Sequence, residues 1–227
     1  MNVKPLYGLR LRTPRLELRL GSRDELVELG QLAREGIHPP AEMPFEVPWT
    51  DRSEEPTFVE DFVAYHEETL RRWRPEEWSL NLLAFHHGRP VGSQSVRAEA
   101  FGEAREVDTG SWLGLAFQRQ GLGTEMRAAV LELAFRGLGA QTATSGSIFG
   151  NESSKRVSEK LHGRRDGHDR PAGEAGLEAR PPPRARGVAL PVRHRARGRR
   201  ALPAAVQGYL SFFRAAPIDC FFVSTGS

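Results

Sequence analysis

The sequence predicts an α/β (α+β) domain in which amphipathic helices flank a central sheet. Residues 9–20 alternate between apolar and charged side chains, the period-two pattern of a half-buried strand, with one interrupting proline. An apolar run over residues 112–117 meets a glycine-containing turn, and a strongly helical segment over residues 124–136 follows at once. With 227 residues, of which 39% are hydrophobic and 27% charged, the chain has the composition of one globular domain with an appendage.

The other elements follow from local signals. Ser22 and Glu25 have the spacing of a capping box and predict the start of a helix. Residues 36–56 form a loop that is pinned by prolines but too apolar to be a linker. Residues 57–74 predict a second amphipathic helix. Three strands are predicted next, at 79–85, 91–98 and 105–117. A helix at 124–136, a strand at 140–149 and a helix at 151–161 follow them.

Composition excludes some functional classes. No run approaches the 18 apolar residues of a membrane span, and the N-terminal residues lack the apolar region of a signal peptide, so we expect a cytoplasmic protein without a membrane partner. The single cysteine, Cys220, excludes an internal disulfide, and no spacing of His, Asp and Glu predicts a metal site. The net charge of +3 arises in residues 162–200, which hold eleven arginines against four acidic residues, and the rest of the chain is net acidic.

The turn at residues 118–123 carries the strongest functional signal. The first N–H groups of a helix lack partners within the helix and attract anions, and Gly121 and Gly123 remove Cβ atoms that would keep a phosphate away. The chain has no G-x-x-x-x-G-K-[ST] motif, and Met126 stands where a dinucleotide fingerprint requires its third glycine. We therefore predict a phosphate-bearing cofactor, the alternative being a plain strand-to-helix turn.

The remaining pattern, Q/R-x-x-G-x-G/A after a strand, resembles the acyl-CoA pyrophosphate loop of the GNAT N-acetyltransferases. Three further motifs resemble the Rim-like branch, named for ribosomal-protein N-terminal acetyltransferases: T-x-R-L-x-L-R at 13–19, G-x-W-L-G at 110–114 and N-x-x-S at 151–154. The M-P-F-x-V-P-W loop at 43–49 resembles an actinobacterial subgroup that includes succinyl-CoA users. The resemblance covers about residues 9–161. It implies the GNAT fold, a mixed and mostly antiparallel twisted sheet with a splayed strand pair and flanking helices.

The resemblance also implies a cofactor, acetyl-CoA or another acyl-CoA such as succinyl-CoA. Its pantetheine amides would pair with the end of the central strand, and its pyrophosphate would bind the turn and the helix start. The residues expected to bind it are Leu113, Gly114, Leu115, Gln118, Arg119, Gln120, Gly121, Leu122, Gly123, Thr124 and Asn151.

Acyl transfer to a primary amine requires a proton acceptor. Glu106 and Asp108 lie two residues apart and so on one face of the predicted strand, and Asp108 is the preferred candidate because it is nearer the splay. A carboxylate of pKa about 4 is a poor base for an ammonium of pKa about 10, so a water relay or desolvation is expected. By resemblance, Ser154 would protonate the leaving thiolate. The alternatives are solvated carboxylates and simple helix capping by Asn151.

The amine acceptor enters over the proline-rich loop. His38, Phe45 and Trp49 are candidate substrate-binding residues, with ordinary core packing as the alternative. The acceptor could be a protein N-terminus, a lysine or a small-molecule amine. The sequence also leaves open whether the protein forms a homodimer.

Residues 162–227 depart from the family pattern. In place of two further strands the chain becomes rich in arginine and proline. We interpret this as the result of a reading-frame shift near residue 162, which a strand-patterned alternative frame in the gene would support. A genuine basic tail for RNA is the rival interpretation. Two functional alternatives follow: a catalytically impaired CoA-binding remnant, or a nucleic-acid-associated protein.

Overall fold

A computed structural model describes residues 3–146, 151–161, 190–191 and 219–222 of the chain. Its strands in chain order are β1 (Leu9–Arg12), β2 (Leu16–Arg19), β3 (Glu77–His86), β4 (Arg89–Glu99), β5 (Glu106–Leu113), β6 (Thr142–Thr144), β7 (Leu190–Pro191) and β8 (Asp219–Phe222). They form one sheet in the order β7-β6-β5-β4-β3-β2-β1-β8. Every neighbouring pair is antiparallel except β5 and β6, which are parallel.

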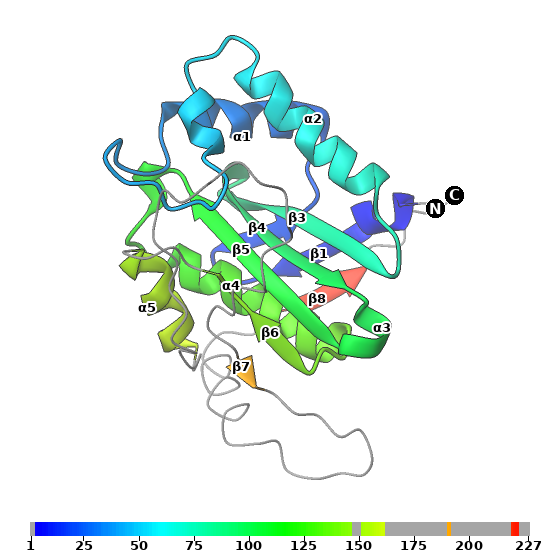
Figure 1. The fold of residues 1–227 in the computed structure, drawn as a ribbon. Helices are drawn as coiled ribbons and strands as arrows, with labels where there is room; N and C mark the ends of the chain where they lie inside the picture. The colour runs from blue at the N-terminus through cyan, green and yellow to red at the C-terminus, as the bar shows by residue number, and fades with distance from the viewer. Residues whose placement is uncertain (1–2, 147–150, 162–189, 192–218, 223–227) are drawn as a thin grey trace, which may run out of the picture.

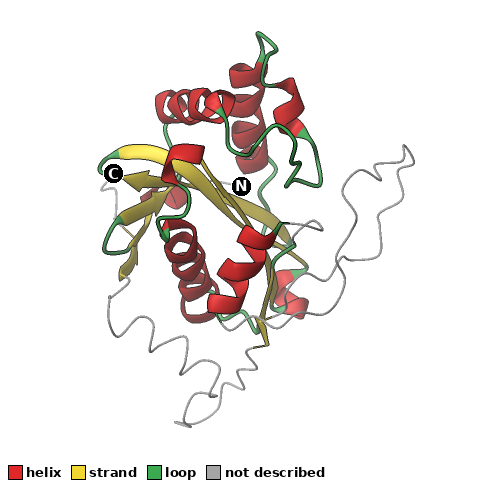
Figure 2. Cartoon of the chain, turned by 90° about the vertical axis from the view of Figure 1, so that its left-hand side faces the viewer, coloured by secondary structure: helices red, strands yellow, loops and turns green. Residues whose placement is uncertain are grey.

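Helices cover both faces of this sheet (Figures 1 and 2). They are α1 (Arg23–Glu35), α2 (Phe58–Arg71), α3 (Phe101–Ala104), α4 (Leu122–Glu132) and α5 (Glu152–Lys160), with 3₁₀ turns η1 (Lys4–Gly8), η2 (Trp49–Arg52) and η3 (Leu115–Phe117) and a π-helical turn η4 (Leu133–Gly137). The pair α1 and α2 lies on one face, and α4 with α5 lies on the other. The predicted fold class, with a mixed and mostly antiparallel sheet, is confirmed.

The two faces of β3 explain its nearly continuous apolar run. Leu82 and Ala84 join the core beneath α4, whereas Leu83 and Phe85 pack against α1 and α2. Successive side chains of a strand point to opposite faces, so a strand with helices on both sides is apolar at both sets of positions. Because helices pack on both of its faces, β3 holds the centre of the sheet in place.

Residues 9–20, predicted as one strand, form the hairpin of β1 and β2. Thr13 turns the chain: its N–H donates to the carbonyl of Leu16 at 2.9 Å, and its hydroxyl oxygen accepts from the N–H of Leu16 at 2.9 Å. The alternation of side chains is the same on both arms, so periodicity alone did not reveal the reversal. The turn residues of this hairpin reach the candidate site.

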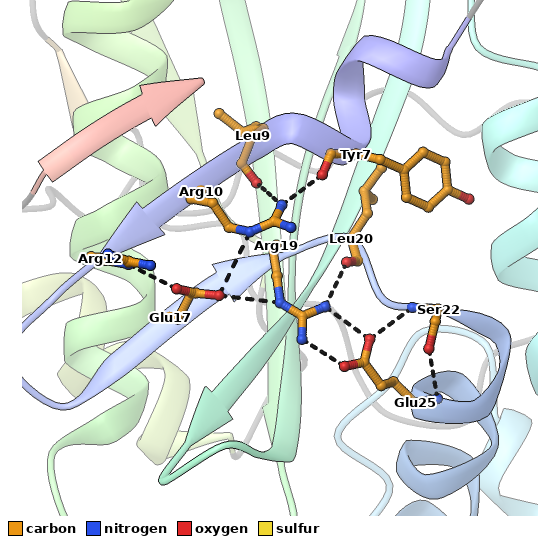
Figure 3. A network of polar contacts seen from close by, with 9 residues as sticks. All are labelled: Tyr7, Leu9, Arg10, Arg12, Glu17, Arg19, Leu20, Ser22 and Glu25. Carbon is orange, nitrogen blue, oxygen red and sulfur yellow. Dashed lines mark hydrogen bonds and ion pairs between the residues drawn. The ribbon is translucent and has the colours of Figure 1, made fainter. Parts of the chain in front are cut away.

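The predicted capping box at the start of α1 is present and belongs to a larger polar network (Figure 3). Ser22 accepts from the N–H of Glu25, and the Glu25 carboxylate accepts from the N–H of Ser22. The same carboxylate forms a two-pronged ion pair with Arg19 of β2, at 2.8 and 2.6 Å. The hydrogen bond from Arg19, with the main-chain bond from Ser22, lowers the pKa of Glu25 to about 2.

The tail contributes short strands at both edges of the sheet. β7 pairs with β6, and β8 pairs antiparallel with β1. The two residues of β7 thus add a short segment at one edge of the sheet. The other expectations for residues 162–227 fall on positions outside the described residues, apart from those of β8.

Candidate functional site

The divergence of β5 from β6 is the central feature of the site. The two strands pair over three residues each, and the last pair is Asp108 opposite Thr144. β5 then continues to Leu113, held on its other edge by β4 as far as Gly92. Among the described residues, the stretch of β5 after Asp108 is therefore paired on one edge only.

The direction of the main-chain N–H and C=O groups decides which of them are available for hydrogen bonds on the β6 side of β5. The N–H and C=O of Gly110 both meet side chains of β4, those of Ser95 and Gln94. Main-chain groups alternate between the two edges along a strand, so those of Ser111 and the N–H of Leu113 face the divergence. Such an edge can accept an extended chain of amides as an additional strand.

The three residues predicted to pair with pantetheine differ in this respect. Leu113 faces the gap, although its carbonyl accepts a hydrogen bond of 2.9 Å from the side chain of Gln118. Gly114 and Leu115 donate their N–H groups to carbonyls of β4 and of the loop after α1, at 3.0 and 3.2 Å. The unpaired edge consequently extends back from Leu113 to Ser111, which sequence reasoning did not include.

The glycine turn ends at an uncapped helix start. Gly121 is the N-cap of α4 with φ of +80°, a left-handed conformation that favours glycine, and no side chain caps the helix. A Cβ on Gly123 would approach no heavy atom closer than 3.7 Å, so internal packing does not require glycine there. Leu122 and Thr124 bury their side chains and offer only their main chain. This geometry fits an anion held by helix N–H groups.

The side chains of the turn mostly hold the turn itself. Nε2 of Gln118 donates to the carbonyls of Ile37 and Leu113, at 2.7 and 2.9 Å, and Gln120 bonds back to the main chain of η3. Arg119 adopts φ of +60° and is exposed, with no partner in the described part of the chain. Its predicted contribution to phosphate binding stays a prediction.

The β1–β2 hairpin holds the start of α4 from outside. Arg15 pairs with Glu125 in the first turn of the helix through two nitrogens, at 2.6 and 2.7 Å, and its Nη1 donates to the carbonyl of Gln120 at 2.8 Å. The hydroxyl of Thr13 donates to the other oxygen of Glu125. The ion pair neutralises a carboxylate that would otherwise lie beside an anion site. Local patterns could not reveal a contact between segments about 110 residues apart.

The predicted proton acceptor Asp108 lies at the point of divergence with both oxygens engaged. Nε of Arg97 donates to Oδ1 and the hydroxyl of Thr144 donates to Oδ2, each at 3.0 Å. Glu106 shares this face of β5, is half-buried, and has no side-chain partner among the residues described. A carboxylate can accept about four hydrogen bonds, so Asp108 retains room for a water molecule.

Asn151 caps α5 as the alternative interpretation anticipated. Its Oδ1 accepts from the N–H of Ser154 at 3.1 Å. Helix α5 lies beside α4 (Figure 1), and Val157 approaches the position that a Cβ of Gly123 would occupy, at 4.0 Å. The Ser154 side chain is half-buried, and its catalytic role stays a prediction.

The predicted acceptor residues come together in an aromatic cluster. Phe45 packs between His38 and Trp49, with ring centroids 5.7 and 5.4 Å away. Trp49 also contacts Trp112 of β5 at 5.8 Å. Trp112 lies four residues from Asp108 and so on the same face of the strand. The cluster therefore lies on the same face of the sheet as the two carboxylates. Nδ1 of His38 donates to the carbonyl of Pro39, which leaves Nε2 to accept from a threonine hydroxyl at 2.8 Å.

Arg127 of α4 is a site residue that the sequence interpretation missed. Its side chain is 4% exposed, and Nη2 donates to the hydroxyl of Ser111 across 3.4 Å. Burial lowers the pKa of Arg127 to about 10, against the opposing effect of the charge on Asp108, so the guanidinium stays protonated at neutral pH. The sequence signal that could have revealed its burial is the spacing of four residues between Arg127 and Leu131, which puts both on the same face of the helix.

Two other features bear on the kind of site. The described residues contain no cluster of three or more His, Cys, Asp or Glu side chains that could hold a metal ion. No helix within them is long and apolar enough to cross a membrane.

Comparison with known proteins agrees with this geometry. The profile of the acetyltransferase (GNAT) domain family matches residues 15–164. RimJ of Mycobacterium smegmatis, solved with a CoA disulfide, superposes with a TM-score of 0.61 at 16% identity over 94% of this chain and 95% of its own. RimL, a ribosomal L7/L12 alpha-N-protein acetyltransferase solved with coenzyme A, gives 0.55 at 18% identity over 68% and 82%. A Vibrio cholerae protein provisionally assigned as a ribosomal-protein-serine acetyltransferase gives 0.57 at 20% identity over 80% and 97%.

The fold and the divergent strand pair thus define an acyl-CoA-dependent transferase architecture. The chain belongs to the GNAT acetyltransferase family. The resemblance inferred from sequence motifs is confirmed at the family level, and the Rim proteins among the solved structures with this fold are consistent with the Rim-like branch.

Proposed function

We propose that this enzyme transfers an acyl group, acetyl or succinyl, from acyl-CoA to a primary amine by direct attack. The observation that carries the proposal is the unpaired edge of β5 leading to the uncapped N-terminus of α4. The pyrophosphate of CoA binds the N–H groups of the glycine turn, and the pantetheine amides extend the sheet along Ser111 and Leu113. The family match and the CoA bound to RimL and RimJ support this donor.

The reaction then follows from the groups around the divergence. The amine nitrogen attacks the thioester carbonyl, a C–N bond forms, the C–S bond breaks, and CoA leaves as a thiolate. A water held by Asp108, with Glu106 on the same face, takes a proton from the acceptor ammonium first, and the free amine that results is the group that attacks. Ser154 returns a proton to the thiolate, and Asn151, besides capping α5, contacts the pantetheine. The aromatic cluster of His38, Phe45 and Trp49 forms one wall for the acceptor.

The remaining parts of the proposal concern the setting of the reaction. Residues 9–161 form the catalytic core and residues 162–227 an appendage, a division supported by the family match at 15–164. The acceptor is a protein N-terminus, a lysine or a small-molecule amine. We propose a cytoplasmic enzyme, with a homodimer as one assembly to be tested by its mass in solution.

Calorimetric titration of the full chain with CoA tests the proposal, followed by release of free CoA from acyl-CoA across a panel of primary amines. We expect saturable binding and amine-dependent release. A folded chain that does not bind CoA would contradict the proposal. Binding without release for any amine would instead identify a CoA-binding remnant.

A further inference from the structure

The side chain of Gln118 joins two segments that lie 81 residues apart in the chain. Its Nε2 donates to the carbonyl of Ile37 at 2.7 Å and to the carbonyl of Leu113 at 2.9 Å, so both N–H groups of the amide are used. Ile37 begins the loop that carries the candidate acceptor residues, here called the acceptor loop (residues 37–50), and Leu113 ends β5. One side chain therefore fastens the acceptor loop to the end of the strand that offers the proposed cofactor edge.

The position of Ile37 determines where the aromatic cluster lies. Its side chain is 4% exposed and belongs to a small core of α1 and α2 residues, against which Phe45, Trp49 and Trp112 pack. His38 follows directly, and its ring contacts Phe45 with centroids 5.7 Å apart. A displacement of Ile37 would therefore move the wall that is proposed for the acceptor.

The two ends of the acceptor loop are held together by His38. Its Nε2 accepts from the hydroxyl of Thr50 at 2.8 Å, and its Nδ1 donates to the carbonyl of Pro39 at 2.9 Å. Thr50 is buried, with 8% of its surface exposed. The loop is thus closed on itself, and the bond from Gln118 anchors the closed loop as a unit.

The donor turn does not depend on the side chain of Gln118 alone. Nε2 of Gln120 donates to the carbonyl of Ala116 at 2.8 Å, and Arg15 donates to the carbonyl of Gln120 at 2.8 Å. These contacts remain when the amide of Gln118 is removed. The carbonyl of the buried Ile37, in contrast, loses its side-chain donor, and an unpaired buried carbonyl is unfavourable.

We propose that Gln118 is a positioning residue for the amine acceptor, because its side chain holds the acceptor loop and its aromatic wall against the end of β5. The inference rests on the proposed function, which puts the acceptor at this wall. The main-chain N–H groups of the same turn keep their proposed role in binding the donor phosphates. One turn thus serves both substrates, the donor through its main chain and the acceptor through the side chain of Gln118.

The variant Gln118→Met tests this assignment, because methionine keeps the length of the side chain but has no hydrogen-bond donor of comparable strength. The KM for the amine that gives the fastest release of CoA should rise about tenfold, the effect of one or two lost hydrogen bonds. The kcat and the Kd for CoA, measured by calorimetry, should each change by less than about threefold. Amide hydrogen exchange of residues 37–50 should become faster, while exchange in β3 stays unchanged.

The matched control is Gln31→Met, which makes the same change at an exposed position of α1. Its kinetic constants, its affinity for CoA and its loop exchange should equal those of the unmodified protein. Gln118→Asn keeps the amide but is one methylene shorter, so it cannot span both carbonyls and should give a smaller rise in the KM for the amine. Thermal unfolding of each variant is measured alongside.

Three results would overturn the assignment: an unchanged KM for the amine with unchanged loop exchange in Gln118→Met, a loss of affinity for CoA as large as the loss for the amine, or the same effects in Gln31→Met. The second result would make the side chain a donor contact. If Gln118→Met does not fold, the same measurements on Gln118→Asn decide the question. If the unmodified protein releases CoA with no amine, the proposed function fails, whereas loop exchange and CoA affinity still test Gln118.

Discussion

The two edges of β5 differ in how they are closed. On the β4 side, six residue pairs run from Arg97 opposite Asp108 to Gly92 opposite Leu113. On the β6 side, three pairs are followed by a divergence. One edge of β5 therefore belongs to the paired centre of the sheet, and its other edge is the proposed cofactor-binding edge. A binding edge can be held in place by pairing of the opposite edge, without a loop of its own.

The side chains reinforce this asymmetry. On the closed edge, Ser95 and Gln94 add hydrogen bonds to the main chain of Gly110. At the vertex, the hydroxyl of Thr144 reaches Asp108 and so ties the two diverging strands at the last point where they meet. Beyond that point the main-chain groups of Ser111 and the N–H of Leu113 have no strand partner among the described residues, and a ligand could complete their hydrogen bonds.

The largest expected effect comes from breaking the closed edge. A Cβ on Gly92 would lie 2.3 Å from the carbonyl oxygen of Trp112, so Gly92→Ala must separate β4 from β5. We expect a loss of about 3 kcal/mol in the free energy of unfolding, measured by urea denaturation. Gly102→Ala is the matched control, because no heavy atom lies within 4 Å of its Cβ position. Equal stability of both variants would show that β4 does not clamp β5.

The next effect concerns the vertex. Asp108→Asn should lower kcat about 100-fold, the contribution of a general base, while the unfolding temperature changes little. Steady-state release of CoA with the best amine measures this. The control is Asp61→Asn, an exposed carboxylate of α2 that pairs with Arg52. An unchanged kcat in Asp108→Asn would remove it from the proton path and leave Glu106 as the remaining carboxylate of this face.

A smaller effect is expected at the end of the open edge. Arg15→Ala removes the ion pair to Glu125 and the bond to the Gln120 carbonyl, and so exposes a negative charge beside the phosphate turn. The KM for acyl-CoA should rise about tenfold, with kcat within about twofold, since the loss of about one charged interaction affects donor binding alone.

Arg23→Ala is the matched control for this substitution. Arg23 also pairs with carboxylates, Glu60 and Glu67, but it does so on the exposed surface of α1 and α2. Its KM should equal that of the unmodified enzyme. A fall in kcat for Arg15→Ala without a change in KM would contradict a role in holding the turn.

The smallest expected effect is on the pH dependence of stability, and it concerns Glu25, which lies away from β5. The pKa of Glu25 is lowered from 4.5 to about 2, so its ionised form stabilises the fold above pH 4.5, and this stabilisation is lost as the pH falls toward 2. Glu25→Gln should therefore reduce the free energy of unfolding by about 1–2 kcal/mol at pH 7. Urea titrations at several pH values should show the difference shrinking to zero near pH 2. A constant difference across this range would refute the ion pair as its origin, and kinetic constants should not change.

Local signals predicted much of the fold because their causes are local. The capping box of Ser22 and Glu25 forms within four residues, and the apolar faces of α1, α2 and α4 follow from helical periodicity. Strand ends were predicted less well. The strand predicted at 105–117 ends at Leu113, after which the chain enters η3. Residues 147–149 of the strand predicted at 140–149 lie outside the described residues. A strand ends where its hydrogen-bonded pairing with the neighbouring strand ends, and that neighbour belongs to another part of the chain.

The candidate site divides in the same way. The turn at residues 118–123 could be predicted because a glycine at the N-cap position, with a second glycine two residues later and no capping side chain, is visible in the sequence. Gln118 proved to hold the turn, and Gly114 and Leu115 proved to be engaged elsewhere, because their partners lie on distant segments. The same reason hid Arg15 and Arg127, whose surroundings come from the β1–β2 hairpin and from β5.

The sequence by itself therefore determined the order of the main helices and strands after residue 20, the glycine turn before α4 and the family, since each depends on residue spacing within one segment. The tertiary structure alone decided which edge of β5 stays unpaired among the described residues, that Asp108 is shared between Arg97 and Thr144, and that Arg127 is buried with no hydrogen-bond partner for its Nε in the described part of the chain. These features depend on the distance between groups brought together by folding. Electrostatic and hydrogen-bond energies are set by that distance and by burial, which no spacing along the chain specifies.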